Sequence, residues 1–393
     1  MHTPQLTQTL EILDRLIGFD TTSSKSNLDL IDYVERYLDG YGVSSRRFPS
    51  PCGTKANLLA TIGSKQGGGI IWSGHTDVVP VEGQSWNTAP YKMTHADPNH
   101  IVGRGVTDMK GFLACCLALV PRLVAETPAT PIHLCFSYDE EVGCLGVRSV
   151  IHELANWPTK PKGCIVGEPT NCRIVTGHKT KRSLRVRVTG TTAHSSLAPQ
   201  AVNAVHYASR LITQIADIAE QLERDGEQDT MFSVPHTTAH VGLIHGGTQL
   251  NIVPSDCYFD FEFRVLPQLD ADAQVRRVVE AAGKLTAKMK QKSDLAGIEF
   301  ESLAAFPGLD MSSQDPWVTT MMGVAGVNDV EKVAYGAEAG LFQMSAGIPT
   351  VICGPGTIED AHKPNERLDI QQLVSCLRIL ERSAYSNHYL GVR

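Results

Sequence analysis

A histidine and an aspartate stand together where a strongly apolar run of the sequence ends. His75 and Asp77 follow residues 70–72, and Pro80 closes the stretch. This pattern predicts a short buried strand that ends at the two polar residues. Residues two apart in an extended chain point to the same side, so His75 could bind a metal while Asp77 orients its ring. On its own, such a pair is more often an ordinary hydrogen bond.

Further carboxylates and a second histidine stand where other apolar runs end or in the loops that follow, and Asp108 stands in a Gly-rich turn before such a run. They are Asp108, Glu140, Glu141, Glu168 and His362. In open α/β sheets, sites form outside the carboxyl ends of the strands. Each acid taken singly could cap a helix or face solvent. Their joint occurrence at successive strand ends indicates a common site.

The residue types in this set are those of a zinc site. Histidine and carboxylate ligands suit Zn²⁺, and the candidates are His75, Asp108, Glu141, Glu168 and His362. Five ligands exceed what one tetrahedral ion needs, but they fit two ions ~3.5–4 Å apart if one carboxylate bridges them. Glu140 could then stay free as the general base that takes a proton from the activated water and returns it to the leaving amine.

Composition excludes several other classes of function. The chain has 393 residues, of which 42% are hydrophobic and 20% charged, as expected for a soluble globular protein of two domains. The net charge of −7 argues against nucleic acid or an anionic membrane as the main partner. No apolar run is long enough to span a bilayer, and no secretion signal opens the sequence. The 10 cysteines include no Cys-x-x-Cys pair, so we expect reduced core residues of a cytoplasmic protein.

The elements that position these residues follow from hydrophobic periodicity. Apolar residues at helical spacing predict an opening helix over 6–17, and Asn27 is a candidate cap of a second helix that stops at Gly40. Strand and helix then alternate, which predicts an α/β domain with a largely parallel sheet. Residues 181–304 have the order βαββαβ, a ferredoxin-like unit able to fold by itself. Residues 305–393 must return to the first domain, 1–180, because they carry His362.

These motifs closely resemble the two-zinc aminoacylase and carboxypeptidase metallopeptidase family over nearly the whole chain. The matching segments are Gly74-His75-Thr76-Asp77, Gly105-Val106-Thr107-Asp108-Met109-Lys110-Gly111, Asp139-Glu140-Glu141, Gly167-Glu168-Pro169 and Ala361-His362-Lys363-Pro364. The resemblance implies that Asp108 bridges two zinc or cobalt ions in each subunit. His75 and Glu168 would complete one metal site, and Glu141 and His362 the other. It also implies Glu140 as the base, Asp77 as the residue that orients His75, and a cis peptide bond after Asp108.

The resemblance also assigns roles to the inserted domain, as a lid through which a homodimer forms. His194, in the segment 192–196, would reach the neighbouring subunit's site and stabilise the oxyanion; otherwise it is a surface histidine. Asn251 and Arg264 match positions linked to substrate binding. Arg264 could grip a carboxylate with two hydrogen bonds, or it could be a solvated strand arginine.

Segments 335–342 and 353–364 resemble the acetylornithine deacetylase branch of this family. The resemblance implies hydrolysis of N2-acetyl-L-ornithine to L-ornithine and acetate, a step of arginine biosynthesis. Glu338 would then hold the δ-ammonium group of the substrate, or else cap a helix that begins near residue 339. Another N-acyl amino acid deacylase or a dipeptidase remains the alternative enzyme. An inactive binding module would have lost Glu140 or a ligand, and a metal-buffering dimer would not explain a free base beside a ligand.

Overall fold

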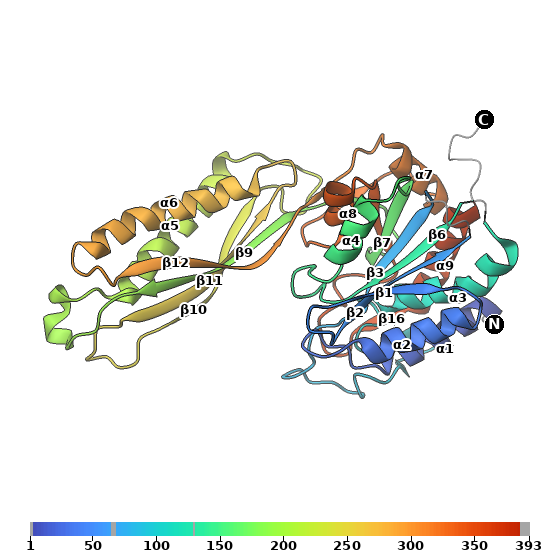
Figure 1. The fold of residues 1–393 in the computed structure, drawn as a ribbon, viewed down its shortest axis with the longest axis horizontal. Coiled ribbons are helices and arrows are strands. Elements are labelled where there is room, and N and C mark those ends of the chain that lie inside the picture. The colour runs from blue at the N-terminus through green and yellow to red at the C-terminus, as the bar shows by residue number, and fades with distance from the viewer. Residues whose placement is uncertain (1–2, 64–67, 129, 386–393) are drawn as a thin grey trace. The chain divides into compact units, whose positions relative to one another are not determined.

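The computed structural model describes residues 3–63, 68–128 and 130–385, and these form two compact units (Figure 1). Unit 1 comprises Met1–Gly177, Leu309–Lys332 and Ala337–Arg393, and unit 2 comprises His178–Gly308 and Val333–Gly336. The chain thus leaves unit 1, builds unit 2, and returns.

Among the described residues, the larger sheet has nine strands in the order β1-β2-β6-β3-β7-β15-β8-β13, with β14 paired to β8. Its centre is parallel, because β3 runs parallel to β6 and β7, and β15 runs parallel to β7. The strands are β1 (Ser45–Pro49), β2 (Ala56–Ile62), β3 (Ile70–His75), β6 (Ile132–Ser137), β7 (Gly163–Pro169), β8 (Val175–His178), β13 (Leu309–Asp310), β14 (Glu331–Val333) and β15 (Thr350–Gly354). A small antiparallel sheet joins β4 (Thr94–His95), β5 (His100–Val102) and β16 (Arg367–Asp369).

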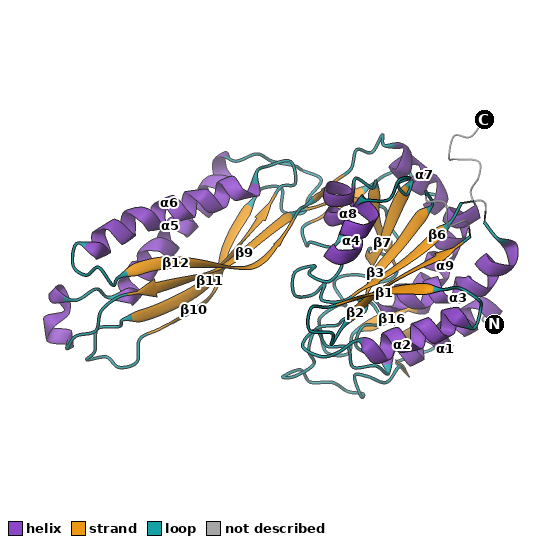
Figure 2. Ribbon diagram, in the orientation of Figure 1, coloured by secondary structure: helices purple, strands orange, loops and turns teal. Residues whose placement is uncertain are grey.

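Helices lie on both faces of the parallel sheet (Figure 2). They are α1 (Pro4–Ile17), α2 (Leu28–Asp39), α3 (Lys110–Glu126), α4 (Arg148–Ala155), α7 (Pro316–Ala325), α8 (Ala339–Ala346) and α9 (Ile370–Tyr385). Helix α3 packs closely on the sheet. A Cβ atom at Gly167 would lie 2.0 Å from the Phe112 ring, and one at Gly74 would lie 2.6 Å from Met109. Glycine at these strand positions therefore lets α3, and with it Asp108 just before the helix, lie against the strand ends.

Unit 2 has the order β9, α5, β10, β11, α6, β12 and so forms the βαββαβ arrangement of a ferredoxin-like fold. Its antiparallel sheet has the order β10-β11-β9-β12. The elements are β9 (Thr180–Thr189), the 3₁₀ turn η1 (Ser195–Gln200), α5 (Ala204–Asp225), β10 (Thr238–Gly246), β11 (Asp256–Val265), α6 (Ala271–Lys290) and β12 (Gly297–Phe306). In β11, buried residues such as Phe259 and Phe261 alternate with more accessible ones such as Asp260. The buried face packs against α5 and α6.

The mixed α/β fold with a largely parallel sheet is confirmed, and one local prediction is wrong. Asn27 precedes α2, but its side chain makes no capping hydrogen bond. Its amide instead bonds both backbone groups of Ala56 and the hydroxyl of Thr76. A buried polar side chain takes the partners that tertiary packing brings to it, and here they lie on the sheet.

The structure also describes the cysteines and the apolar character of the helices. All ten cysteines are free, and only Cys52 is exposed. Within the described part of the chain, no helix is both long and apolar enough to cross a membrane.

Candidate metal centre

The carboxyl ends of β3, β6 and β7 place three groups of candidate ligands side by side. The register pairs His75 with Ser137 and Ser73 with Val166. His75 therefore ends β3 at the level where β6 ends and the chain turns towards Glu140, while Glu168 lies in the last part of β7. Parallel neighbours deliver their ends to one edge of the sheet, as the sequence pattern predicted.

Asp108 lies between the two histidines. Its Oδ1 is 2.9 Å from His75 Nε2, and its Oδ2 is 3.1 Å from His362 Nε2. The carboxylate thus directs one oxygen to each imidazole. This is the arrangement expected of a ligand shared by two ions.

Each histidine has a second carboxylate beside it. His75 Nε2 lies 3.8 Å from Glu168 Oε1, and His362 Nε2 lies 3.1 Å from Glu141 Oε1. The His75 side chain is 1% exposed, whereas that of His362 is 48% exposed. The structure therefore brings all five candidate ligands together as two sets that share Asp108, one buried and one open to solvent.

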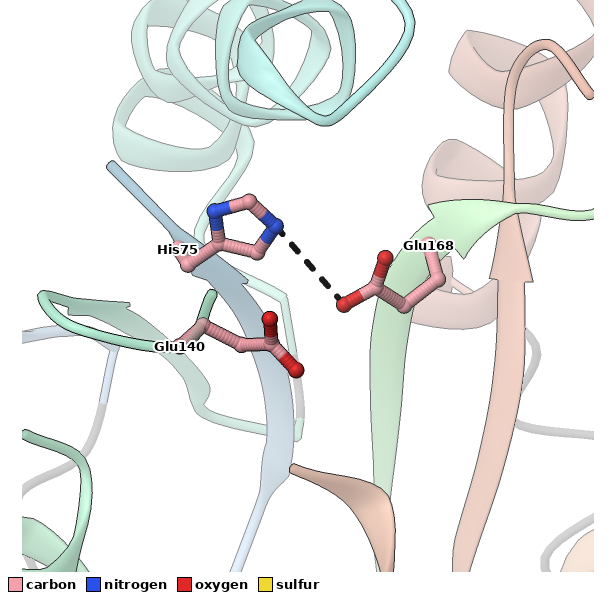
Figure 3. A group of neighbouring side chains, drawn as sticks. All are labelled: His75, Glu140 and Glu168. Carbon is pink, nitrogen blue, oxygen red and sulfur yellow. Dashed lines mark ion pairs between the residues drawn. The ribbon is translucent and has the colours of Figure 1, made fainter. Parts of the chain in front are cut away.

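Glu140 belongs to the same cluster. His75, Glu140 and Glu168 point towards one another (Figure 3), and one ligand atom from each lies within 4.8 Å of the others. A thiol reaches Glu140 as well, because Cys144 Sγ donates to Oε1 at 3.3 Å. Glu140 thus lies among the candidate ligands.

Burial and mutual charge shift the titration of the cluster's carboxyl and imidazole groups. Burial raises the pKa of Glu140 and Glu168 well above the usual value, and that of Glu141 to about 6. Burial also acts to raise the pKa of Asp108, but the two histidines outweigh it and the pKa is lowered. Asp108 and Glu141 in turn raise the pKa of His362 to about 11.

The donor set of this cluster suits a divalent cation. Four carboxyl groups converge on two imidazoles, and burial raises the pKa of Glu140, Glu141 and Glu168 because a negative charge is costly away from water. Among the described residues, Glu168 Oε1 is buried without a hydrogen-bond partner. A cation would satisfy that oxygen and favour the ionised form of the carboxyl groups, and nitrogen and carboxylate oxygen are the ligands that Zn²⁺ accepts.

Asp77 supports the cluster in two ways. The Nδ1 atom of His75 lies 2.8 Å from the Asp77 carbonyl and 3.6 Å from its carboxylate, so the main chain supplies the closer contact. The carboxylate accepts hydrogen bonds from Ser23 Oγ and from the backbone amides of Glu140 and Glu141. Asp77 therefore ties the end of β3 to the segment that carries Glu140 and Glu141.

The peptide bond Asp108-Met109 is cis, as the resemblance implied. The backbone before it is held by Glu366, a residue that no sequence motif singled out. Glu366 is 1% exposed and accepts hydrogen bonds from the main chain around Asp108 and from the side chain of Arg104. The only feature that marks Glu366 in the sequence is its position four residues after His362. Nothing in the sequence pairs it with Arg104, 262 positions away.

Glu338 is a buried acid of unit 1. It is 1% exposed and lies near Ser137, so its carboxylate is not presented to solvent. It precedes α8 but does not cap it. Neither carboxylate oxygen has hydrogen-bond geometry with any described residue. Burial raises the pKa of Glu338 to about 7, and the Ser137 hydroxyl opposes this only in part.

Unit 2 carries the other expected residues. It brings His194 next to the segment of Asn251, because Ser195 donates to the Asn251 carbonyl and His194 forms a bridge with Ile252. The Nδ1 atom of His194 accepts the Ser196 amide at 3.2 Å, which places the ring proton on Nε2. Arg264 lies on β11 and donates to Glu262 at 2.9 Å.

The chain is similar to known proteins over most of its length. The model of peptidase family M20/M25/M40 matches residues 71–386. Acetylornithine deacetylase of Aliivibrio fischeri is 31% identical over 368 residues, which cover 94% of each chain. Two solved structures share the fold: aminopeptidase PepT from Bacillus cereus (TM-score 0.75, 21% identity, covering 96% of this chain and 98% of that one) and the metallo-carboxypeptidase Sso-CP2 from Sulfolobus solfataricus (TM-score 0.76, 19% identity, covering 96% and 98%).

Proposed function

Because the chain belongs to peptidase family M20/M25/M40, it is a metal-dependent amide hydrolase, and we propose that it removes the acetyl group from N2-acetyl-L-ornithine. The products would be L-ornithine and acetate, as in arginine biosynthesis. The named relative at 31% identity supports this substrate. The single observation that carries the chemistry is Asp108, whose two oxygens face His75 and His362.

We propose two zinc ions per subunit, with cobalt as an alternative. His75, Asp108 and Glu168 would hold one, and Asp108, Glu141 and His362 the other. A bound ion of this kind lowers the pKa of water from 15.7 to ~7 and polarises the amide carbonyl. The chain's own residues then supply the proton transfer and the positioning.

Glu140 is the proposed general base. Its pKa is raised by burial, and nearby cations would lower it again towards the range in which it accepts a proton at neutral pH. It would take the proton of the attacking water and give it to the amide nitrogen as the C–N bond breaks. Asp77 keeps Glu140 in place through the backbone amide, at 3.1 Å.

His194 is the proposed donor to the oxyanion, supplied by the partner subunit of a homodimer that forms through unit 2. The proton on Nε2, fixed by Ser196, makes the ring a hydrogen-bond donor without requiring a positive charge. Asn251 and Arg264 are proposed to contact the substrate. We place the enzyme in the cytoplasm, where an arginine precursor would be processed.

A panel of substrates tests this function. Acetylornithine, succinyl-diaminopimelate, acetylmethionine and a dipeptide would be incubated with the protein, with and without added Zn²⁺, and the products identified. Acetylornithine should give the highest kcat/KM. The similar fold of two peptidases makes peptide hydrolysis the second candidate, and preferential cleavage of the dipeptide would replace our proposal with it.

A further inference from the structure

The carboxylate of Glu366 is surrounded by donors from the loop that carries Asp108. Its Oε1 accepts the backbone amides of Thr107 at 2.9 Å and Asp108 at 3.0 Å. Its Oε2 accepts the Gly105 amide at 2.9 Å and the Arg104 guanidinium at 2.8 Å. One buried side chain thus satisfies three backbone amides of the loop that would otherwise be costly to bury.

The loop depends on this contact because it has no regular structure of its own. Gly105 has a φ of +84°, and a Cβ there would lie 2.8 Å from Val78. The backbone is joined to the Glu366 segment as well, since Gly103 donates to the Glu366 carbonyl at 3.0 Å. The Glu366 side chain and backbone therefore both hold residues 103–108 by hydrogen bonds.

The same network continues to His362. Arg104, which is 1% exposed, donates from Nη2 to Gln84 Oε1 at 2.5 Å. Gln84 Nε2 in turn donates to the His362 carbonyl at 3.1 Å. His362 has a φ of 58°, a left-handed backbone that a non-glycine residue adopts only with local support. A chain of hydrogen bonds thus runs from the Asp108 amide through Glu366, Arg104 and Gln84 to His362.

We propose that Glu366 is a positioning residue that sets the spacing of Asp108 and His362 before any ion binds, and that Arg104 and Gln84 carry this constraint to His362. The inference rests on the proposed metal centre and extends it. Glu366 does not touch an ion or the substrate. It reduces the reorganisation needed to assemble the shared ligand and its partner, which is how outer residues raise the metal affinity of a site.

The test is a titration of metal-free protein with Zn²⁺ by isothermal calorimetry, without substrate. Glu366→Gln keeps the shape but turns an amide NH₂ towards backbone N–H donors. We expect ~10- to 100-fold weaker Zn²⁺ binding, the range seen when such supporting partners are lost. Glu359→Gln is the matched control, since Glu359 is an exposed acid in the segment that also carries His362 and Glu366. It should bind as the wild type does.

A folded Glu366→Gln protein with wild-type affinity for both ions would overturn the proposal. If that variant does not fold, Gln84→Ala decides instead, because Gln84 is partly exposed and its loss breaks the connection from Arg104 to His362 while Glu366 keeps its own hydrogen bonds. Several-fold weaker binding of the Zn²⁺ ion assigned to His362 supports the network, and unchanged Zn²⁺ binding refutes it. An incorrect substrate assignment alters none of these results. A wild-type protein that takes up fewer than two ions would instead contradict the dinuclear proposal.

Discussion

Replacing Glu338 by glutamine tests how burial acts on an acid of unit 1. The carboxylate is 1% exposed, and neither oxygen has hydrogen-bond geometry with a described residue. Its pKa is raised from 4.5 to about 7, mainly by burial. Glutamine keeps the shape of the neutral acid and cannot ionise. The difference in stability between the two proteins therefore measures the free-energy cost of ionising the buried carboxyl group.

The sign of the effect follows from where each state holds the proton. Below pH 4.5 the carboxyl is protonated in both folded and unfolded chains, so the variant and the wild type should be about equally stable. Between pH 4.5 and 7 the unfolded chain ionises first, and the wild type loses stability as the pH rises. The shift of about 2.5 units, from 4.5 to about 7, corresponds to ~3 kcal/mol at 1.36 kcal/mol per unit. At about pH 8 we expect Glu338→Gln to be the more stable protein by roughly that amount.

Urea unfolding of the metal-free protein at several pH values measures this difference. All four tryptophans (Trp72, Trp86, Trp157 and Trp317) lie in unit 1, so their fluorescence reports the unit that contains Glu338. Glu11→Gln, an exposed acid of α1, should change the free energy of unfolding by less than ~0.5 kcal/mol at every pH. A Glu338→Gln protein that is no more stable than the wild type at about pH 8 would refute the burial argument.

The same variant decides whether Glu338 recognises the substrate. Contact with the δ-ammonium group predicts a ~10- to 100-fold lower kcat/KM for acetylornithine and little change for acetylmethionine. Burial alone predicts unchanged selectivity. An equal loss on both substrates would assign Glu338 to the support of the metal centre.

Three further outcomes follow from the site. Chelation should abolish hydrolysis, and Zn²⁺ or Co²⁺ should restore it; full turnover by protein shown to be metal-free would contradict the metal centre. Glu140→Ala should slow the chemical step by ~10²-fold or more with metal content nearly intact, whereas Glu141→Ala should lower metal content. Equal metal loss in both variants, measured by elemental analysis, would show that the two roles are misassigned. Removing the His194 side chain should raise the activation free energy of hydrolysis by ~2.7–4 kcal/mol. Activity should return when His194→Ala and Glu140→Ala subunits exchange into one dimer, and no return after confirmed exchange would exclude a site completed by the partner.

Local patterns were sufficient to predict the main elements and the candidate ligands. The apolar run that ends at His75 is β3, the helical spacing over residues 6–17 belongs to α1, and the βαββαβ order of unit 2 is present. These features are readable because side-chain periodicity and strand ends are properties of neighbouring residues. The metal-type residues were recognisable because several occur at successive strand ends, where a parallel sheet must bring them to one edge.

Tertiary structure alone decided which partners these residues have. The bond between Arg104 and Glu366 joins positions 262 apart, and no local pattern encodes it. Asn27 bonds the sheet instead of capping its helix, and Glu338 is buried near Ser137 instead of capping α8. Burial, hydrogen bonding and pKa depend on distances through space, and those distances exist only once the strands and loops have packed.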